Sequence, residues 1–206
     1  MTRPGPLLIA SRSPDKVREI RAILCHLPRL ALLSLEEADV GPEAAEESIE
    51  TFETFRENAL AKARYFVERT GLAVLADDSG IEIDELDGAP GVRSRRFCGR
   101  DDLTGQDLDR ANNDLLLERL RGLPANRRGA RYVCAAVLLA PGTAARTAVG
   151  TCRGRILEEP RGSGGFGYDP LFWVEAATAT FGALPPDQKH RFSHRARAFR
   201  ALANVF

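Results

Sequence analysis

Two adjacent carboxylates, Asp77 and Asp78, are the residues of this sequence whose types and spacing are most suggestive of chemistry. They directly follow the apolar run at residues 72–76, which predicts a buried strand that begins after Gly71. Two acidic side chains at the end of a strand concentrate negative charge where a ligand can reach it. Such a pair suits Mg²⁺, a hard cation that prefers oxygen ligands and keeps several of its waters. A solvated Asp-Asp-Ser-Gly turn explains the same residues equally well.

A second candidate site joins a predicted first strand, at residues 7–10, to the start of a helix. Ser13 is placed to cap this helix, and Pro14 occupies its first turn. Backbone N–H groups and the helix dipole attract phosphate to such a helix end, and Lys16 adds its charge one turn further on. A capped helix with an exposed lysine is the alternative, and the local sequence alone favours it.

Residues 162–167 match the pattern G-x-G-x-x-G, but we reject a dinucleotide fingerprint there. That fingerprint needs a preceding strand and a helix that starts within it, whereas Pro170 biases Asp169 away from helical geometry. The segment instead predicts a glycine loop whose aromatic residue, Phe166, stacks on a base; a purely structural loop is equally compatible. His194 and Arg195, in the first turn of the last predicted helix, either donate to ligand oxygens or are solvated.

No P-loop motif and no G-x-S-x-G motif occurs in the sequence, which excludes a P-loop and argues against an α/β-hydrolase nucleophile. The remaining signals are a cation site, a helix end that attracts phosphate, an aromatic ring and several hydrogen-bond donors. Together these are the parts of a nucleoside triphosphate site.

The elements that must position these residues mix strands and helices without strict alternation, which predicts an α/β fold with a mixed sheet. An acidic connector spans residues 36–50, and the length of 206 residues fits one domain covering residues 1–206. We predict strands at residues 7–10, 31–35, 72–76, 81–86, 130–140, 146–156 and 171–174, and helices from residue 14 and at 51–69, 104–121 and 193–205, with residues 130–156 forming a hairpin.

The composition limits the partners of the protein. Lys plus Arg equals Asp plus Glu, 29 each, so no overall field attracts nucleic acid or an anionic membrane. Lysine occurs only at Lys16, Lys62 and Lys189 in a chain rich in arginine, which marks these three positions for inspection. The four cysteines are widely spaced and predict reduced thiols. With no signal-peptide pattern and no apolar run long enough to span a bilayer, we expect a cytoplasmic protein.

Six blocks of sequence, in this order and running nearly end to end, resemble the inosine triphosphate pyrophosphatase family. That family hydrolyses non-canonical purine nucleoside triphosphates to the monophosphate and pyrophosphate, and it favours the bases hypoxanthine and xanthine over adenine and guanine. The blocks are Ser11 to Lys16 followed by Val17-Arg18-Glu19, Thr54-Phe55-Arg56-Glu57-Asn58-Ala59, Ala76-Asp77-Asp78-Ser79-Gly80, Gly88-Ala89-Pro90-Gly91-Val92, Gly164-Gly165-Phe166-Gly167-Tyr168-Asp169-Pro170, and Lys189 with Ser193-His194-Arg195.

The resemblance implies an elongated mixed sheet flanked by helices, two lobes with a central active-site cleft, and a homodimer that acts on a small-molecule nucleotide with Mg²⁺. It implies that Asp78 is the catalytic acid or base and a metal ligand, with Glu50 as a second carboxylate near the metal. The implied substrate-binding residues are Ser11, Arg12, Ser13, Pro14, Asp15, Lys16 and Ser79 for the triphosphate, Phe166, Gly167, Tyr168 and Asp169 for the base, and Lys189, His194 and Arg195 for the nucleotide.

The sequence also departs from the pattern of that family. Ser11-Arg12-Ser13 stands where the family typically has Thr-Gly-Asn, Phe52 replaces a usual glycine close to Glu50, and Arg95 replaces a usual small residue. Two alternative functions remain: a related pyrophosphatase of similar architecture for modified pyrimidine nucleotides, and a nucleotide-binding regulator whose altered Ser11-Arg12-Ser13 segment holds ligand without turnover. The intact pair of aspartates argues against the regulator, because binding alone needs no carboxylate that activates water.

Overall fold

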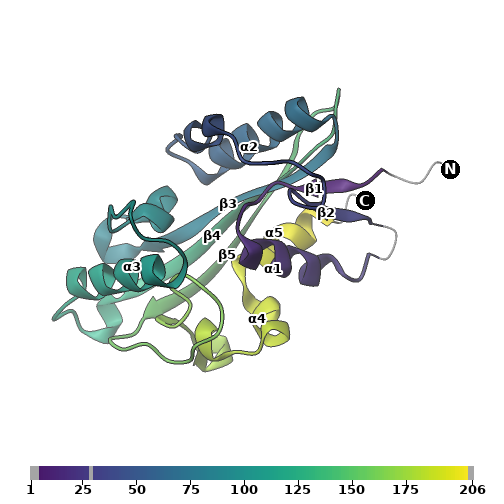
Figure 1. Ribbon diagram of the computed structural model, residues 1–206. Helices are drawn as coiled ribbons and strands as arrows, with labels where there is room; N and C mark the ends of the chain where they lie inside the picture. Colours follow the sequence, from purple (N-terminus) through teal and green to yellow (C-terminus); the bar gives the residue numbers. More distant parts are fainter. Residues whose placement is uncertain (1–4, 28–29, 204–206) are drawn as a thin grey trace. The chain divides into compact units, whose positions relative to one another are not determined.

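A long strand, β3 (Ala73–Ile83), runs through the middle of the sheet and carries both aspartates. The computed structural model describes residues 5–27 and 30–203. Within these residues, seven strands form one sheet in the order β2-β1-β3-β4-β5-β6-β7. Figure 1 labels β1 to β5. The other strands are β1 (Leu7–Ile9), β2 (Leu32–Ser34), β4 (Gly129–Leu139), β5 (Arg146–Ile156), β6 (Phe172–Val174) and β7 (Ala179–Thr180).

The sheet is mixed, as predicted. β1 pairs in parallel with both β2 and β3, with Leu7 opposite Leu32 and Ala73, whereas β6 pairs antiparallel with both β5 and β7. β4 and β5 are neighbours in the sheet and are consecutive in the chain, in agreement with the predicted hairpin. The helices are α1 (Pro14–Leu24), α2 (Phe55–Thr70), α3 (Gly105–Arg119), α4 (Pro186–Phe192) and α5 (His194–Ala203).

The alternative of a solvated turn at residues 77–80 is wrong, because β3 continues through these residues without a break. The two strands predicted at 72–76 and 81–86 are therefore one. Asp, Ser and Gly favour turns when they stand in solvent, but residues 74–78 are buried here, and pairing with β1 begins at Ala73. Tertiary pairing thus overrides the local preference for a turn.

Local signals place the helix ends. The Ser13 hydroxyl accepts a hydrogen bond from the Lys16 amide at 3.4 Å and so caps α1 as predicted. Thr54 caps α2 by accepting from the Glu57 amide at 3.2 Å, so this helix begins at Phe55 and not at residue 51 as predicted. α2 ends at Gly71, whose φ of 67° lies in the left-handed region. The predicted end of the last helix, near Val205, lies outside the described residues.

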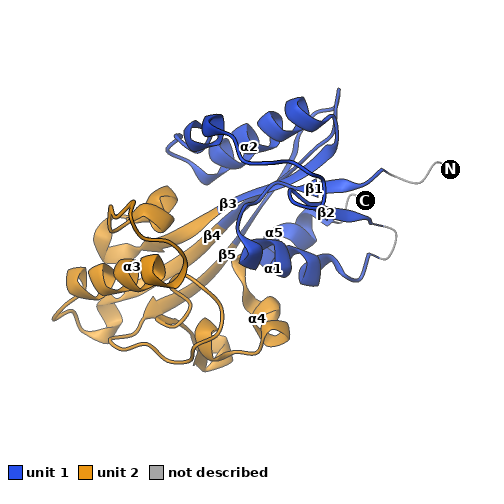
Figure 2. Cartoon of the chain, viewed as in Figure 1, with its two compact units in different colours: residues 1–78, 134–150, 195–206 blue, residues 79–133, 151–194 orange. Residues whose placement is uncertain are grey.

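The chain divides into two compact units, each built from separate segments (Figure 2). Unit 1 comprises residues 1–78, 134–150 and 195–206, and unit 2 comprises residues 79–133 and 151–194. The single domain, the elongated shape and the cleft between lobes therefore stay predictions.

The core of unit 1 lies between the sheet and two helices. Side chains of α1 and α5, such as Ile20 and Phe199, pack with Leu75 of β3 and Ala136 of β4. Figure 1 shows α2 on the other side of the same strands. Both faces of this part of the sheet are therefore covered, and β3 reads as a nearly continuous buried run.

The core of unit 2 is rich in aromatic side chains. Tyr132 of β4, Phe172 of β6 and Phe181 pack with Leu116 and Leu120 of the α3 region. The rings of Tyr132 and Phe172 meet edge to face, with 4.7 Å between their centroids. This cluster supports the segments of unit 2 that carry the expected base-binding residues.

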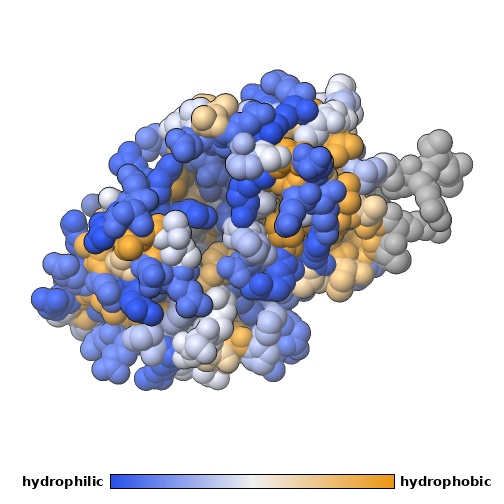
Figure 3. Space-filling view, viewed as in Figure 1, coloured by the Kyte–Doolittle hydropathy of each residue, from blue (hydrophilic) through white to orange (hydrophobic). Residues whose placement is uncertain are grey.

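Hydrophilic side chains cover most of the face of the molecule that is shown in Figure 3. Among the described residues, the exposed large hydrophobic side chains are those of Phe52 and Val149, which are 46% and 57% exposed. Within the described part of the chain, none of the helices combines the length and the apolar character that crossing a membrane requires.

Candidate active site

Asp77 and Asp78 point to opposite faces of the sheet, because side chains alternate along a strand. Asp77 shares its face with Leu75, which packs in the core formed with α1 and α5. Asp78 points to the other face, where its Oδ2 accepts a hydrogen bond from Asn58 Nδ2 of α2 at 3.0 Å. The two carboxylates therefore occupy separate environments, although they are neighbours in the sequence.

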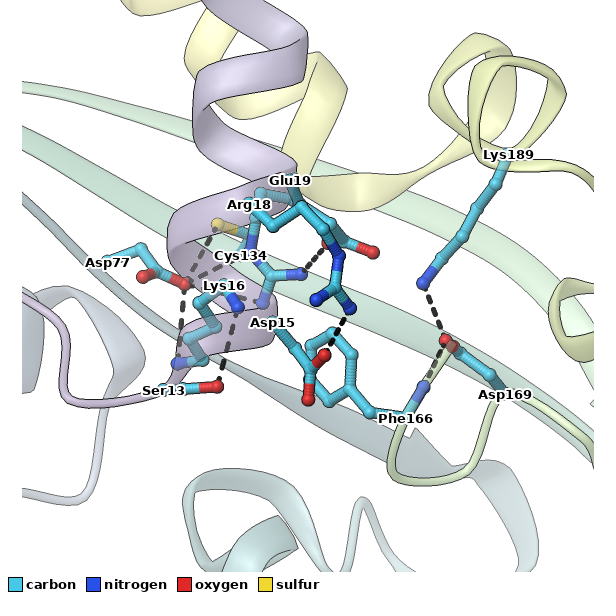
Figure 4. A network of polar contacts seen from close by, with 11 residues as sticks. Ser13, Asp15, Lys16, Arg18, Glu19, Asp77, Cys134, Phe166, Asp169 and Lys189 are labelled. Carbon is cyan, nitrogen blue, oxygen red and sulfur yellow. Dashed lines mark hydrogen bonds and ion pairs between the residues drawn. The ribbon is translucent and has the colours of Figure 1, made fainter. Parts of the chain in front are cut away.

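Asp77 is the centre of a buried ionic network in unit 1 (Figure 4). Its Oδ2 lies 3.4 Å from Lys16 Nζ and 3.4 Å from both Nε and Nη2 of Arg195. Cys134 Sγ donates to the same oxygen at 3.9 Å, and Arg195 Nη1 also pairs with Glu19 at 2.5 Å. With Asp77 only 1% exposed, this network holds Lys16 on the helix end that was expected to receive phosphate.

The surroundings keep Asp77 ionised. Burial alone would raise the pKa of its carboxyl, but the positive charges of Lys16, Arg195 and Lys62 outweigh burial and lower that pKa well below its ordinary value. Burial and the charge of Asp77 also raise the pKa of the Cys134 thiol. Asp77 is thus a permanent anion that anchors cations, and Cys134 is an unreactive thiol.

The environment shifts Asp78 in the opposite direction. Burial raises the pKa of its carboxyl, and the nearby negative charge of Glu50 adds to this effect, while Lys16 and Lys62 oppose it without cancelling it. A pair of carboxyls whose pKa values are pushed apart divides into a fixed charge and a proton acceptor. Asp78, which is 6% exposed, is therefore the candidate general base.

Lys62 of α2 links Glu50 to the backbone of β3, a role that sequence reasoning missed. It forms an ion pair with Glu50 and donates from Nζ to the carbonyl oxygen of Asp77 at 2.8 Å. Burial raises the pKa of Glu50, but Lys62 and Lys16 more than offset this and lower it. The scarcity of lysine was the only signal in the sequence that pointed to this residue.

Asn58 is a second residue that sequence reasoning did not assign to the site. Its side chain accepts from the Phe52 amide at 2.9 Å, donates to the Phe52 carbonyl at 3.2 Å and also donates to Asp78. The backbone that follows Glu50 is thereby tied to the candidate base. Phe52 keeps a largely exposed ring, so this departure from the family pattern leaves its backbone contacts with Asn58 in place.

The segment at residues 11–16 has the hydrogen bonds of a capped helix start. Ser11 Oγ accepts from the Ser13 amide at 3.2 Å, and Asp15 forms an ion pair with Arg18 along the helix surface. Capping of α1 by Ser13 is confirmed. Phosphate binding by this segment stays a prediction, supported by Lys16 and by the N-terminal end of the helix dipole.

Arg12 is directed away from the other residues of this segment. Its Nε and Nη2 contact Glu46 at 2.9 and 2.6 Å, while Nη1 and Nη2 donate to the carbonyls of Val40 and Gly41, each at 2.7 Å. Arg69 contacts Glu46 as well, at 3.0 Å. The guanidinium of Arg12 therefore ties the segment at residues 11–16 to the connector that leads to Glu50. The expected contact of Arg12 with the triphosphate stays a prediction.

Replacing Arg12 by Ala is expected to lower the free energy of unfolding by about 1 kcal/mol, since charge-assisted hydrogen bonds to a partly exposed group are lost. Replacement by Lys should restore little, because an ammonium lacks the planar fork that spans a carboxylate and two carbonyls. Urea unfolding of the wild type and of both variants measures this difference. Full recovery in Arg12→Lys would show that charge alone accounts for the effect.

In unit 2, the glycine loop is held by an ion pair. Lys189 Nζ of α4 contacts Asp169 Oδ2 at 2.5 Å, and the same oxygen accepts from the Phe166 amide at 3.0 Å (Figure 4). Lys189 Nζ also lies 5.2 Å from the ring centroid of Phe166, within the range of a cation–π contact. The structure thus brings together three of the residues that the sequence predicted for the base and the nucleotide.

The other expected residues of unit 2 are placed individually. The hydroxyl of Tyr168 donates to the Ser94 carbonyl at 2.8 Å, and its ring belongs to the core. His194 stacks on Tyr132, with 4.5 Å between ring centroids and 5° between ring planes. Ser79 is the first residue of unit 2 and lies in β3. Tyr132 is a contact of the site that sequence reasoning missed.

The expected magnesium site at Asp78 and Glu50 stays a prediction. Among residues 5–27 and 30–203, no group of three or more His, Cys, Asp or Glu side chains lies close enough to hold a metal by itself. Mg²⁺ is usually held by one or two carboxylates together with phosphates of the substrate. The mutual electrostatic effect of Asp78 and Glu50 matches such a site, because a cation relieves the repulsion between two carboxylates.

Comparison with known families places the chain clearly. The model of the Ham1 family matches residues 7–205. A dITP/XTP pyrophosphatase of Frankia alni is 47% identical over 97% of this chain and 96% of the relative. The dITP/XTP pyrophosphatase of Thermus thermophilus is 43% identical over 100% of this chain and 94% of the relative.

Solved structures show the same relationship. The Ham1 protein of Staphylococcus aureus superimposes with a TM-score of 0.81 at 31% identity, covering 98% of this chain and 97% of the other. A dITP/XTP pyrophosphatase of Mycobacterium abscessus has a TM-score of 0.72 at 40% identity, covering 98% of both chains. These similarities cover the chain from end to end and agree with the α/β fold and mixed sheet described above.

Proposed function

Since the chain belongs to the Ham1 family, we propose that it hydrolyses non-canonical purine nucleoside triphosphates, namely dITP, XTP and ITP. The products are the nucleoside monophosphate and pyrophosphate. This activity removes such nucleotides from the precursor pool. The names of the relatives support the substrate class, and the site in unit 1 supports the chemistry.

The placement of Asp77 and Asp78 on opposite faces of β3 is the observation that carries the proposal, because Asp77 is held in the buried network with Lys16 and Arg195, whereas Asp78 accepts from Asn58 on the other face. Hydrolysis needs a group that accepts the proton of the attacking water, and a carboxyl with a raised pKa suits that role better than one held ionised. Asp78 is therefore the proposed general base for attack on the α-phosphorus. Asp77 does not take part in the proton transfer and instead holds Lys16 in place.

Lys16 and the start of α1 are the proposed site for the phosphates. A compact ammonium and the backbone N–H groups of a helix end offset the negative charge that develops as pyrophosphate leaves. Ser11 and Ser13 add hydroxyls at the same segment. Pairing with Asp77 restricts the motion of Lys16 before the substrate binds.

Asp78 and Glu50 are the residues that would hold Mg²⁺. When bound, the ion supplies charge neutralisation for the phosphates and a water of lowered pKa. Lys62 forms an ion pair with Glu50, so this carboxylate is already oriented. The ionised state of Glu50, which its lowered pKa favours, is the state that a metal ligand requires.

Base recognition is proposed for unit 2. Phe166 offers a ring for stacking, and Lys189 and His194 offer donors that suit the 6-oxo group of hypoxanthine or xanthine. The 6-amino group of adenine is itself a hydrogen-bond donor and would meet the donors of Lys189 and His194. Buried polar groups would then stay unpaired, which disfavours adenine. The contacts of Lys189 with Asp169 and Phe166 support this assignment.

A product assay tests the proposed function. The protein is incubated with Mg²⁺ and inosine, adenosine or deoxythymidine triphosphate, and the phosphate product is identified. We expect pyrophosphate from inosine triphosphate and little from the other two. Preference for a pyrimidine would favour the related pyrimidine pyrophosphatase, binding without turnover would favour the regulator, and release of orthophosphate would contradict the assignment.

We further propose that the protein is a cytoplasmic homodimer that binds neither nucleic acid nor membranes. The balanced charge of the chain and its four free cysteines support a reducing compartment and a small-molecule partner. Light scattering coupled to size exclusion should give twice the 22.5 kDa of one chain. The mass of a single chain would contradict the dimer.

A further inference from the structure

We propose that Asp109 and Asn113 of α3 are positioning residues that hold the Phe166 loop, defined here as residues 162–169, in the conformation that binds the base. The inference rests on the proposed role of Phe166 in binding the base. Both residues lie in unit 2, as does the loop. Neither belongs to the sequence blocks or to the residues assigned to the substrate above.

The two side chains hold both polar backbone groups of one residue. Asp109 Oδ2 accepts from the Gly167 amide at 2.7 Å, and Asn113 Nδ2 donates to the Gly167 carbonyl at 3.0 Å. Because they are four residues apart on α3, the two side chains lie on the same face of the helix. An acceptor and a donor at this spacing match the amide and the carbonyl that they meet.

The same loop is held from its other side by α4. The Phe166 amide donates to Asp169 Oδ2, and the same oxygen also accepts from Lys189 Nζ. The backbone around Phe166 is therefore fixed at two points. Asp169, paired with Lys189, accepts from the Phe166 amide, and α3 binds the amide and the carbonyl of the adjacent Gly167. The side chain of Phe166 makes no hydrogen bonds, so the direction of its ring depends on these backbone contacts and on the contact with Lys189 Nζ, 5.2 Å from the ring centroid.

The loop needs such contacts because glycine gives it conformational freedom. Gly165 and Gly167 have φ values of 72° and 61°, in the left-handed region that other residues rarely adopt. A Cβ on Gly165 would also collide with the carboxylate of Asp169. A glycine-rich backbone loses much entropy when it is ordered, so fixing it before the substrate arrives improves binding.

Packing of α3 does not require these two side chains. Leu108, Asn112 and Leu116 are the buried residues of the helix, whereas Asp109 and Asn113 are only half-buried. Asn112 has its own contacts, with the Cys98 amide and the Arg95 carbonyl. The contacts to Gly167 are therefore separate from the contacts that hold α3 in the fold, which points to a role in placing the loop.

Three variants and one control test the inference: Asp109→Ala, Asn113→Ala, the conservative Asp109→Asn, and Asp114→Ala at an exposed position of the same helix. Hydrogen exchange of the Phe166 loop is measured without nucleotide, and KM and kcat are measured with inosine triphosphate. In both truncating variants we expect exchange of the loop and KM to rise about tenfold, as loss of a charge-assisted or buried hydrogen bond implies, with kcat nearly unchanged.

The conservative variant should recover most of the wild-type behaviour, because an amide oxygen can still accept from Gly167, and Asp114→Ala should match the wild type. Unchanged loop exchange in Asp109→Ala and Asn113→Ala would overturn the inference. Faster loop exchange with an unchanged KM would overturn it too, since the contacts would then hold the loop without serving the base. If one truncating variant does not fold, the other and Asp109→Asn decide the question.

The two proposals can fail separately. Loop exchange is measured without substrate, so it tests the contacts of Gly167 even where the wild-type protein does not hydrolyse inosine triphosphate. Failure of the wild type in the product assay contradicts the proposed function. Wild-type turnover combined with an unaffected loop in the variants contradicts only the role of Asp109 and Asn113.

Discussion

Replacing Asp78 by Asn should lower kcat for inosine triphosphate by about 10³-fold, the usual size of a general-base contribution, while nucleotide binding is largely retained. The amide has the shape of the carboxylate and keeps an oxygen that can accept from Asn58, but it cannot take the proton of the attacking water. Turnover is measured by release of pyrophosphate, and binding is measured by calorimetry with the inactive variant. Full activity would remove Asp78 from its proposed role.

The same substitution should not destabilise the protein. Burial and Glu50 raise the pKa of Asp78 in the folded state, so its ionised form is less favourable there than in the unfolded chain at neutral pH. A neutral amide removes that penalty, and the thermal midpoint without metal should stay the same or rise. Loss of activity with retained stability is typical of a residue kept for function at the expense of stability.

Replacing Asp77 by Asn should have the opposite effect on stability. Asp77 is buried and paired with Lys16 and Arg195, and removing one partner of a buried ionic network costs about 3–5 kcal/mol because it leaves buried charge uncompensated. For a chain of this size, that loss lowers the thermal midpoint by roughly 10 °C. Thermal unfolding followed by circular dichroism measures the shift.

Asp15→Asn is the matched control for Asp77→Asn. Asp15 pairs with Arg18 on the surface of α1, where an ion pair contributes little to stability, so its thermal midpoint should remain close to the wild type. If the thermal midpoint falls as little in Asp77→Asn as in Asp15→Asn, the network around Asp77 does not stabilise the fold. The two adjacent aspartates are thus expected to have different roles: Asp78 acts in catalysis, and Asp77 stabilises the fold.

Much of the fold could be read from the sequence because its signals are local. Ser13 and Pro14 mark the start of α1, and two long extended segments within residues 130–156 predict the hairpin of β4 and β5. The resemblance placed Asp78, Lys16 and Phe166 among the functional residues without any structure. Capping, periodicity and motif spacing depend on neighbours within a few residues, so the sequence by itself contains them.

Tertiary structure alone decided how the residues of the site are used. Residues 77–80 have the composition of a turn, yet they continue β3, which lies between β1 and β4 in the sheet, because burial of Asp77, Asp78 and Gly80 within the sheet outweighs local preference. Arg12 turns to Glu46, 34 residues further along the chain.

The division of roles between Asp77 and Asp78 depends on charges from α1, α2 and α5. Such long-range electrostatic and packing effects arise only when distant segments meet. The sequence could therefore name candidates such as Asp78 and Lys16, whereas the contacts of Lys62, Asn58 and Tyr132 appear only in the folded structure.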